Sequence, residues 1–207
     1  MSLIKEQIKK LNGQFQGISP KEIISWAVNQ SDRAVVTTNF RPYEVAILHA
    51  VVAVKQDIPV IWCDTGYNTQ DTYRHAEELI GRLHLNIDLF VPKQTSAHRD
   101  VLMGVPGIED PRHAKFTEQV KLEPFRRAMD KYRPDIWFTN LRKGQTALRD
   151  SLDILSLGKD GVLKVSPFYH WSDTQLDAYL KEHGLPNEHR YFDPTKVLGN
   201  RECGLHT

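Results

Sequence analysis

Residues 34–63, AVVTTNFRPYEVAILHAVVAVKQDIPVIWC, decide the fold. They open with a β-branched run from Ala34 to Thr38 and continue with an apolar helical pattern from Tyr43 to Val54. A second strand-like run, Pro59 to Cys63, ends the stretch. A strand, a helix and a strand in this order are typical of the parallel unit of α/β proteins.

The same alternation continues toward the C-terminus. We expect helices at 69–83, 122–132 and 172–183, and strands at 87–91, 135–139 and 163–168. Ser172 stands where an N-cap is expected and Gly184 where a C-cap is expected. The pattern predicts a Rossmann-like, open parallel sheet with helices on both faces.

The composition is that of an ordinary globular protein, with 207 residues, 40% of them hydrophobic and 26% charged. We expect one domain, with a helical segment over residues 1–30 and an irregular tail over residues 185–207. The net charge of +1 gives no electrostatic reason to expect nucleic-acid or membrane binding. No membrane-length apolar run and no signal peptide are found, so we expect a cytoplasmic protein.

The two cysteines, Cys63 and Cys203, are too few for a disulfide scaffold or for an iron–sulfur cluster held by four thiolates. The nine histidines form no zinc pattern, so we expect neither a metal nor another cofactor. Cys63 lies in an apolar strand, which favours an inert buried thiol.

Cys203 differs from Cys63 because it lies close to the C-terminus, between Arg201 and His206. Terminal residues are rarely packed, and nearby positive charge favours the thiolate, which is the nucleophilic form. These residues predict a reactive thiol on a mobile arm. An exposed cysteine without a role is the alternative.

Mostly polar segments stand at the ends of three of the predicted strands, where ligands of such sheets bind. They comprise Thr37, Thr38, Asn39, Phe40 and Arg41 at the end of the first strand, Asp64, Thr65, Gly66 and Tyr67 at the end of the second, and Arg142, Lys143, Gln145 and Arg149 after the fourth. Three cations in the last group favour a polyanion site. The first group is equally consistent with a capped turn that places Pro42 at the first helical position, and the second with a β-turn.

Taken together, these blocks resemble the phosphoadenylyl-sulfate (PAPS) reductase family, which has the adenine-nucleotide alpha-hydrolase-like fold. The resemblance runs from about Val35 to the C-terminus, and its terminal block is the most specific. The matching blocks are Thr37 to Phe40 before Leu48-His49, Asp64 to Tyr67 before Thr72-Tyr73-Arg74, Lys121-Leu122-Glu123-Pro124, Trp137-Phe138 before Leu141-Arg142 and Gln145-Thr146, and Arg201 to His206.

The resemblance implies an enzyme of sulfate assimilation and cysteine biosynthesis that reduces 3′-phosphoadenylyl sulfate to sulfite and adenosine 3′,5′-bisphosphate. Cys203 would carry a thiosulfonate, and thioredoxin or glutaredoxin would release sulfite from it. Arg201 and His206 would position the anion and support the thiolate. The groups after the first two strands would hold the adenosine and the phosphosulfate, the cations after the fourth would neutralise the phosphates, and a homodimer is plausible.

Several departures from the family pattern keep alternatives open. The first loop reads Asn39-Phe40-Arg41-Pro42 where the family has Ser-Phe-Gly, and the stretch before Arg201 is shorter than usual. The adenylyl-sulfate reductases of this family carry cluster-binding cysteine pairs, and residues 117–120 lack the first of them, which favours the 3′-phosphorylated substrate. The alternatives are adenylyl-sulfate reduction, Mg²⁺-dependent cleavage of ATP without the thiol, and a nucleotide-binding or regulatory module without turnover.

Overall fold

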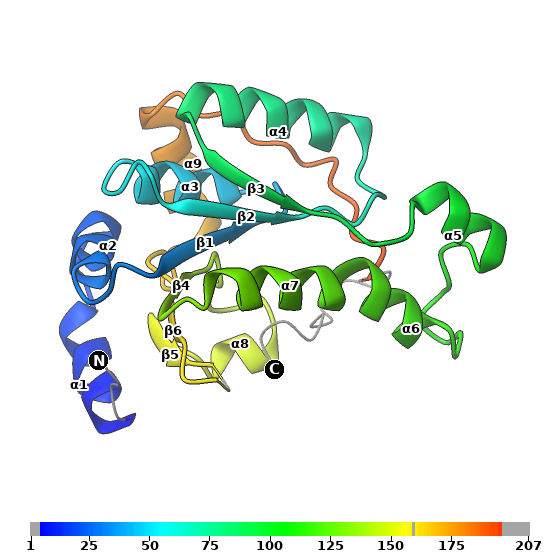
Figure 1. Ribbon diagram of the computed structural model, residues 1–207. Coiled ribbons are helices and arrows are strands. Elements are labelled where there is room, and N and C mark those ends of the chain that lie inside the picture. Colours follow the sequence, from blue (N-terminus) through cyan, green and yellow to red (C-terminus); the bar gives the residue numbers. More distant parts are fainter. Residues whose placement is uncertain (1–4, 159, 196–207) are drawn as a thin grey trace.

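The computed structural model describes residues 5–158 and 160–195, in which six strands form a single sheet (Figure 1). The strands are β1 (Ala34–Thr38), β2 (Pro59–Cys63), β3 (Asn86–Phe90), β4 (Ile136–Phe138), β5 (Leu155–Leu157) and β6 (Leu163–Val165). Their order is β3-β2-β1-β4-β6-β5, and every pair is parallel except β5 with β6. The predicted open, mainly parallel sheet is therefore confirmed.

The strand order reverses at β1. From β1 the chain moves outward through β2 to β3 on one side, and it then returns to place β4 on the other side of β1. The loops after β1 and β4 consequently diverge at the carboxyl edge of the sheet. In sheets of this kind a crevice opens at such a reversal, and ligands bind in it.

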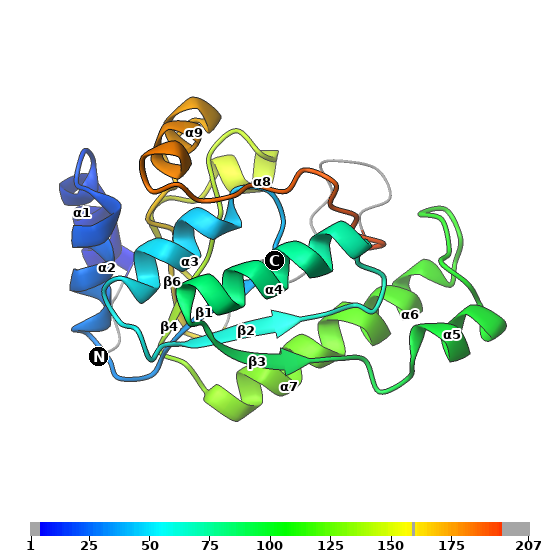
Figure 2. The same ribbon diagram turned by 90° about the horizontal axis from the view of Figure 1, so that it is seen from above.

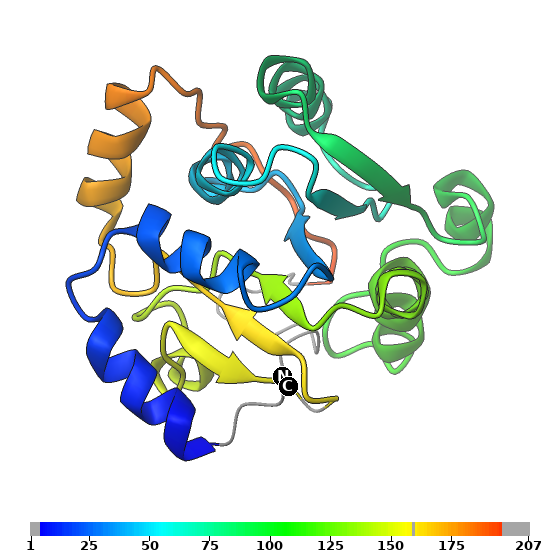
Figure 3. The same ribbon diagram turned by 60° about the vertical axis from the view of Figure 1, so that its left-hand side comes forward.

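Helices cover both faces of the sheet (Figure 3). They are α1 (Lys5–Phe15), α2 (Pro20–Val28), α3 (Glu44–Val52), α4 (Gln70–Leu83), α5 (Ser96–Leu102), α6 (His113–Thr117), the π-helix η1 (Glu118–Leu122), α7 (Glu123–Tyr132), α8 (Ala147–Asp150) and α9 (Asp173–Glu182). Alternate residues of a strand point to opposite faces. Val36 packs in the large core with α2, α3, α4 and α9, whereas its neighbour Val35 packs in a smaller core with α7.

Hydrogen-bonding side chains mark where several helices begin. Thr69 caps α4 through the backbone N–H of Thr72, and Ser172 caps α9 in a capping box with Gln175. These side chains satisfy N–H groups that have no partner inside the helix. The predicted N-cap at Ser172 is confirmed, and Gly184 follows α9 with a φ of 61°.

Two local features differ from the sequence-based expectation. Strand β5 was not predicted, because three residues at a sheet edge give too short a pattern. Its Leu155 exchanges two hydrogen bonds with the amide of Asn12 on α1, at 2.8 and 2.9 Å. The possible helix start at Pro42 is wrong, since Tyr43 has a left-handed φ of 67° and α3 begins at Glu44.

Residues 185–195 contain no helix or strand, as predicted for this part of the tail, and we call them the strap. The strap runs alongside α3 and α4 and reaches the carboxyl edge of the sheet past the starts of these two helices (Figures 1 and 2). The Asn187 amide oxygen accepts a hydrogen bond from the Tyr43 N–H at 2.8 Å. Thr69 Oγ1 donates to the Arg190 carbonyl at 2.9 Å. The predicted catalytic residues Arg201, Cys203 and His206 lie outside the described residues.

Candidate active site at the carboxyl edge

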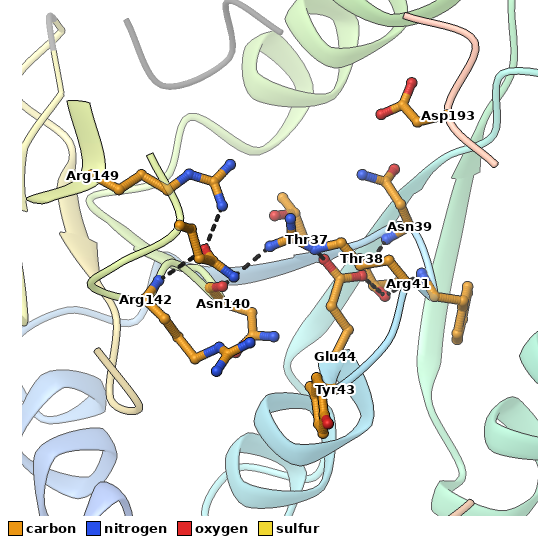
Figure 4. Close-up of polar contacts among 12 residues, drawn as sticks. Thr37, Thr38, Asn39, Arg41, Tyr43, Glu44, Asn140, Arg142, Arg149 and Asp193 are labelled. Atoms are coloured by element: carbon orange, nitrogen blue, oxygen red, sulfur yellow. Dashed lines mark hydrogen bonds and ion pairs between the residues drawn. The ribbon is translucent and has the colours of Figure 1, made fainter. Parts of the chain in front are cut away.

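A cavity of about 250 Å³ opens where the loops after β1 and β4 diverge (Figure 4). Its polar lining comes from both loops, from η1 and from the strap, while its apolar lining comes from the sheet and α7. The lining side chains include Thr37, Thr38, Asn39, Arg41, Glu44, Cys63, Lys121, Phe125, Trp137, Asn140, Arg149 and Asp193. The fold therefore brings together segments that are up to about 150 residues apart in the chain.

The loop after β1 is organised by the buried carboxylate of Glu44, the first residue of α3. One oxygen of this carboxylate accepts from the Asn39 N–H at 2.7 Å and from Thr38 Oγ1 at 2.9 Å. The other accepts from Arg41 Nε at 2.7 Å. Glu44 thus fixes the loop and orients the guanidinium of Arg41, whose Nη2 also donates to the Asn140 carbonyl.

Phe40 has a different role from its neighbours in this loop. Its side chain is 1% exposed and packs edge-on against Trp62, with the ring centroids 4.8 Å apart. The predicted residues Thr37, Thr38, Asn39 and Arg41 line the cavity, whereas Phe40 anchors the loop in the core.

Replacing Glu44 by glutamine is expected to destabilise the protein by about 1–3 kcal/mol, because one carboxylate oxygen becomes an N–H donor facing other donors. Urea unfolding of the variant measures this loss. Asp57→Asn is the matched control, since the Asp57 side chain is 82% exposed and should change stability by less than about 0.5 kcal/mol. Equal effects of the two substitutions would contradict the role assigned to Glu44.

Arg149 supplies a buried cation from the β4 side of the cavity. It is 3% exposed, its Nη1 donates to Gln145 Oε1, and its backbone N–H is capped by Thr146 Oγ1. The Tyr169 hydroxyl donates a hydrogen bond to the Arg149 carbonyl at 2.7 Å. Gln145 therefore positions Arg149, as Glu44 positions Arg41.

Arg142 and Lys143 are directed elsewhere. Arg142 pairs with Asp173 at the start of α9, and its guanidinium lies 5.2 Å from the centre of the Tyr43 ring. Figure 4 shows its side chain running away from Arg149. Lys143 is exposed. Among the described lining residues, neither of them contributes to the cavity.

Lys121 and Asp193 line the cavity but were not among the site residues predicted from the sequence. Lys121 Nζ lies 2.5 Å from Asp193 Oδ2, and the two side chains are 3% and 6% exposed. Burial acts to raise the pKa of Asp193, but the Lys121 charge and hydrogen bonds from Lys121 and Thr195 outweigh it, so the pKa lies below its usual value. The Lys121-Leu122-Glu123-Pro124 block was a signal for Lys121, but the tail pattern gave none for Asp193.

Asp64 to Tyr67 form a turn directly after Cys63 at the end of β2, and none of the four is among the residues that line the cavity. The Asp64 carboxylate accepts from the Gly66 N–H, from the Asn68 amide and from the Tyr73 hydroxyl, at 2.8 to 3.0 Å. The Tyr67 hydroxyl donates to Asp100 at 2.7 Å. Thr65 is buried and Gly66 exposed. These contacts give the segment a rigid shape, and its role in binding stays a prediction.

Cys63 lines the floor of the cavity at the end of β2, and burial raises the pKa of its thiol to about 12. A thiol with this pKa is protonated, and therefore unreactive, at neutral pH. We expect iodoacetamide at pH 7.5 to leave Cys63 unmodified in the folded Cys203→Ser variant and to alkylate it after denaturation. Intact mass measures both results, and rapid alkylation of the folded variant would contradict this assignment.

Metal sites and membrane-spanning helices are both absent from the part of the chain that the structure describes. No group of three or more His, Cys, Asp or Glu side chains within residues 5–158 and 160–195 is arranged to hold a metal ion. Over the same residues, no helix has both the length and the apolar character needed to cross a membrane.

Comparison with known proteins gives a consistent result. The family model for the phosphoadenosine phosphosulfate reductase domain matches residues 33–205. The phosphoadenosine 5′-phosphosulfate reductase of Vibrio atlanticus is 34% identical over 97% of this chain and 88% of its own length. The enzyme of the same name from Erwinia tasmaniensis is 31% identical, over 96% of this chain and 91% of its own length.

Two solved structures share the fold. The PAPS reductase from Candida auris, solved as a phosphate complex, superposes with a TM-score of 0.79 at 24% identity, over 90% of each chain. The FMN adenylyltransferase of Candida glabrata superposes with a TM-score of 0.60 at 12% identity, over 84% of this chain and 57% of its own. The fold is therefore the adenine-nucleotide alpha-hydrolase-like one predicted from the sequence.

Proposed function

The chain belongs to the phosphoadenosine phosphosulfate reductase family and is an oxidoreductase that acts on a sulfur group, and we propose that it reduces 3′-phosphoadenylyl sulfate to sulfite and adenosine 3′,5′-bisphosphate. The main support for the proposal is the cavity at the point where the strand order reverses, between the ends of β1 and β4. Arg41, Lys121 and Arg149 line it together with an apolar wall. A concave site with a few fixed cations suits a polyanionic nucleotide.

We assign the phosphosulfate to the space between Arg41 and Arg149. Both guanidinium groups are held by neighbouring side chains, so they lose little freedom when they bind an anion. The adenosine would extend toward the turn formed by residues 64–67, which follows the lining residue Cys63 in the chain. Gln145 would act by orienting Arg149, whereas Arg142 and Lys143, which do not line the cavity, are assigned no contact with the nucleotide.

The chemical step in this proposal uses Cys203. Its thiolate sulfur forms a bond to the sulfonate sulfur while the sulfur–oxygen bond to the phosphate breaks, and adenosine 3′,5′-bisphosphate leaves with the electron pair. Arg201 and His206 would support the thiolate and the developing anion. The product is a thiosulfonate on Cys203, so one difficult transfer is divided into two easier ones.

The second step needs a protein dithiol, which we propose to be thioredoxin or glutaredoxin. One of its thiolates attacks the Cys203 sulfur, and sulfite leaves with the electrons of the sulfur–sulfur bond. The second thiol then resolves the mixed disulfide, which returns Cys203 and oxidises the donor by two electrons. The proposal places the reaction in the cytoplasm, where thiols stay reduced, and it requires no iron–sulfur cluster.

The direct test is the intact mass of the reduced protein after incubation with each sulfonucleotide. We expect a sulfonate adduct of about 80 Da on Cys203 with 3′-phosphoadenylyl sulfate, and slower or no adduct formation with adenylyl sulfate. Addition of reduced thioredoxin should remove the adduct and release sulfite. No adduct with either donor would refute the proposed chemistry, whereas a faster reaction with adenylyl sulfate would reassign the substrate.

A further inference from the structure

The ion pair between Lys121 and Asp193 joins the strap to the wall of the cavity. Both side chains are almost completely buried, and both line the cavity. Asp193 also accepts from the Thr195 N–H at 3.0 Å and from Thr195 Oγ1 at 2.6 Å. Both carboxylate oxygens are therefore engaged, and Lys121 Nζ contacts Thr195 as well.

A buried ion pair attaches a chain segment only at the expense of a large desolvation free energy. Removing two charges from water costs about as much as their attraction returns, so apolar side chains of similar size would hold the strap equally firmly. An ion pair differs from apolar packing because its charges and hydrogen bonds are satisfied in only one geometry. This contact therefore fixes the position of the strap more than it strengthens its attachment.

The fixed position of the strap matters because Cys203 lies a short distance further along the chain. Cys203 comes eight residues after Thr195, and eight residues span at most about 26–29 Å when fully extended. A shift of Thr195 moves the starting point of every conformation that brings Cys203 to the cavity. Misplacement of a reacting group by about 1 Å can cost on the order of 100-fold in rate.

We propose that Asp193 is a positioning residue of the sulfonate transfer: its ion pair with Lys121 holds the strap at the cavity wall and sets the point from which the segment carrying Cys203 departs. The inference rests on the proposed function, since it assumes that Cys203 is the nucleophile. Asp193 itself need not touch the substrate.

The test compares the rate of Cys203 sulfonation with nucleotide affinity in Asp193→Asn. Asparagine keeps an acceptor for Thr195 but loses the charge that pairs with Lys121. We expect the single-turnover rate of adduct formation, followed by intact mass, to fall about 10-fold or more. The Kd for adenosine 3′,5′-bisphosphate should stay the same or decrease, because a carboxylate leaves the lining of an anion site.

Three further variants make the result specific. Asp193→Glu keeps the carboxylate and should recover most of the rate. Thr195→Val removes one hydroxyl donor to Asp193 and should slow sulfonation moderately without weakening nucleotide binding. Asp71→Asn breaks the ion pair that Asp71 makes with Arg190, whose side chain is 80% exposed, and it should leave both quantities within about twofold of the wild type.

The possible outcomes separate this inference from the proposed function. An unchanged sulfonation rate in Asp193→Asn, with normal adduct formation in the wild type, would overturn the role of Asp193 alone. A parallel loss of rate and nucleotide affinity would also overturn it, because that pattern indicates general damage to the cavity. Absence of the adduct in the wild type would instead refute the proposed function.

Discussion

Replacing Cys203 by serine is expected to abolish sulfite formation, with a loss of at least about 1,000-fold, while nucleotide binding stays within about twofold of the wild type. The serine hydroxyl is a far weaker nucleophile than a thiolate at neutral pH. The cations assigned to nucleotide binding, Arg41 and Arg149, lie in the folded body and do not depend on the sulfur atom. Sulfite release with reduced thioredoxin and calorimetric titration of adenosine 3′,5′-bisphosphate measure the two quantities.

The matched control for this experiment is Cys63→Ala. Cys63 is buried and its pKa is about 12, so it has no part in the proposed transfer. This variant should retain sulfonation and sulfite release, apart from a modest loss of stability. Sulfite release that survives in Cys203→Ser would show that the chemistry does not use this thiol. Activity of the same variant with ATP and an acceptor would instead favour ATP cleavage.

Replacing Arg149 by alanine is expected to have the second largest effect. A hydrogen bond to a charged group contributes about 1.5–3 kcal/mol, so the loss of a buried guanidinium should raise the Kd for adenosine 3′,5′-bisphosphate by about 10- to 100-fold. The Gln145 side chain that orients Arg149 would also lose its partner in this contact. Calorimetric titration at fixed ionic strength measures the change.

Two controls distinguish local from general effects of charge. Arg149→Lys keeps the charge but not the two-pronged geometry, so its Kd should lie between those of the wild type and Arg149→Ala. Arg126→Ala removes a cation whose side chain is 58% exposed and which does not line the cavity, and it should change the Kd by less than about twofold. Equal losses in Arg149→Ala and Arg126→Ala would contradict a specific contact.

The central strands β1 and β2 could be predicted from the sequence because they are almost wholly buried on both faces. Each strand contains consecutive apolar residues, Val35 and Val36 in β1 and Val60 and Ile61 in β2, and this is the pattern of a central parallel strand. Strand β5 could not be found in this way. It has three residues at the edge of the sheet, and its pairing with Asn12 depends on a contact 143 residues away.

Site residues could be predicted where the ends of the strands bring them together. They could not be predicted where the orientation of a single side chain decides whether it lines the cavity. The residues at the ends of β1 and β4 were predicted to lie where ligands bind, and Thr37, Arg41 and Arg149 do line one cavity. Arg142 belongs to the same segment after β4 as Arg149, but its guanidinium pairs with the carboxylate of Asp173 and does not line the cavity. Asp193 could not be predicted, because only the folded strap brings it to Lys121.

The contacts that hold the strap also determine when the cavity can form during translation. Its partners Tyr43, Thr69 and Lys121 all precede it in the chain and are translated earlier. When residues 185–195 emerge from the ribosome, every surface that receives them can already be folded. The cavity is thus completed only after the strap has been translated, so nascent chains halted before residue 185 should fold the sheet yet lack the part of the cavity wall that Tyr191 and Asp193 supply.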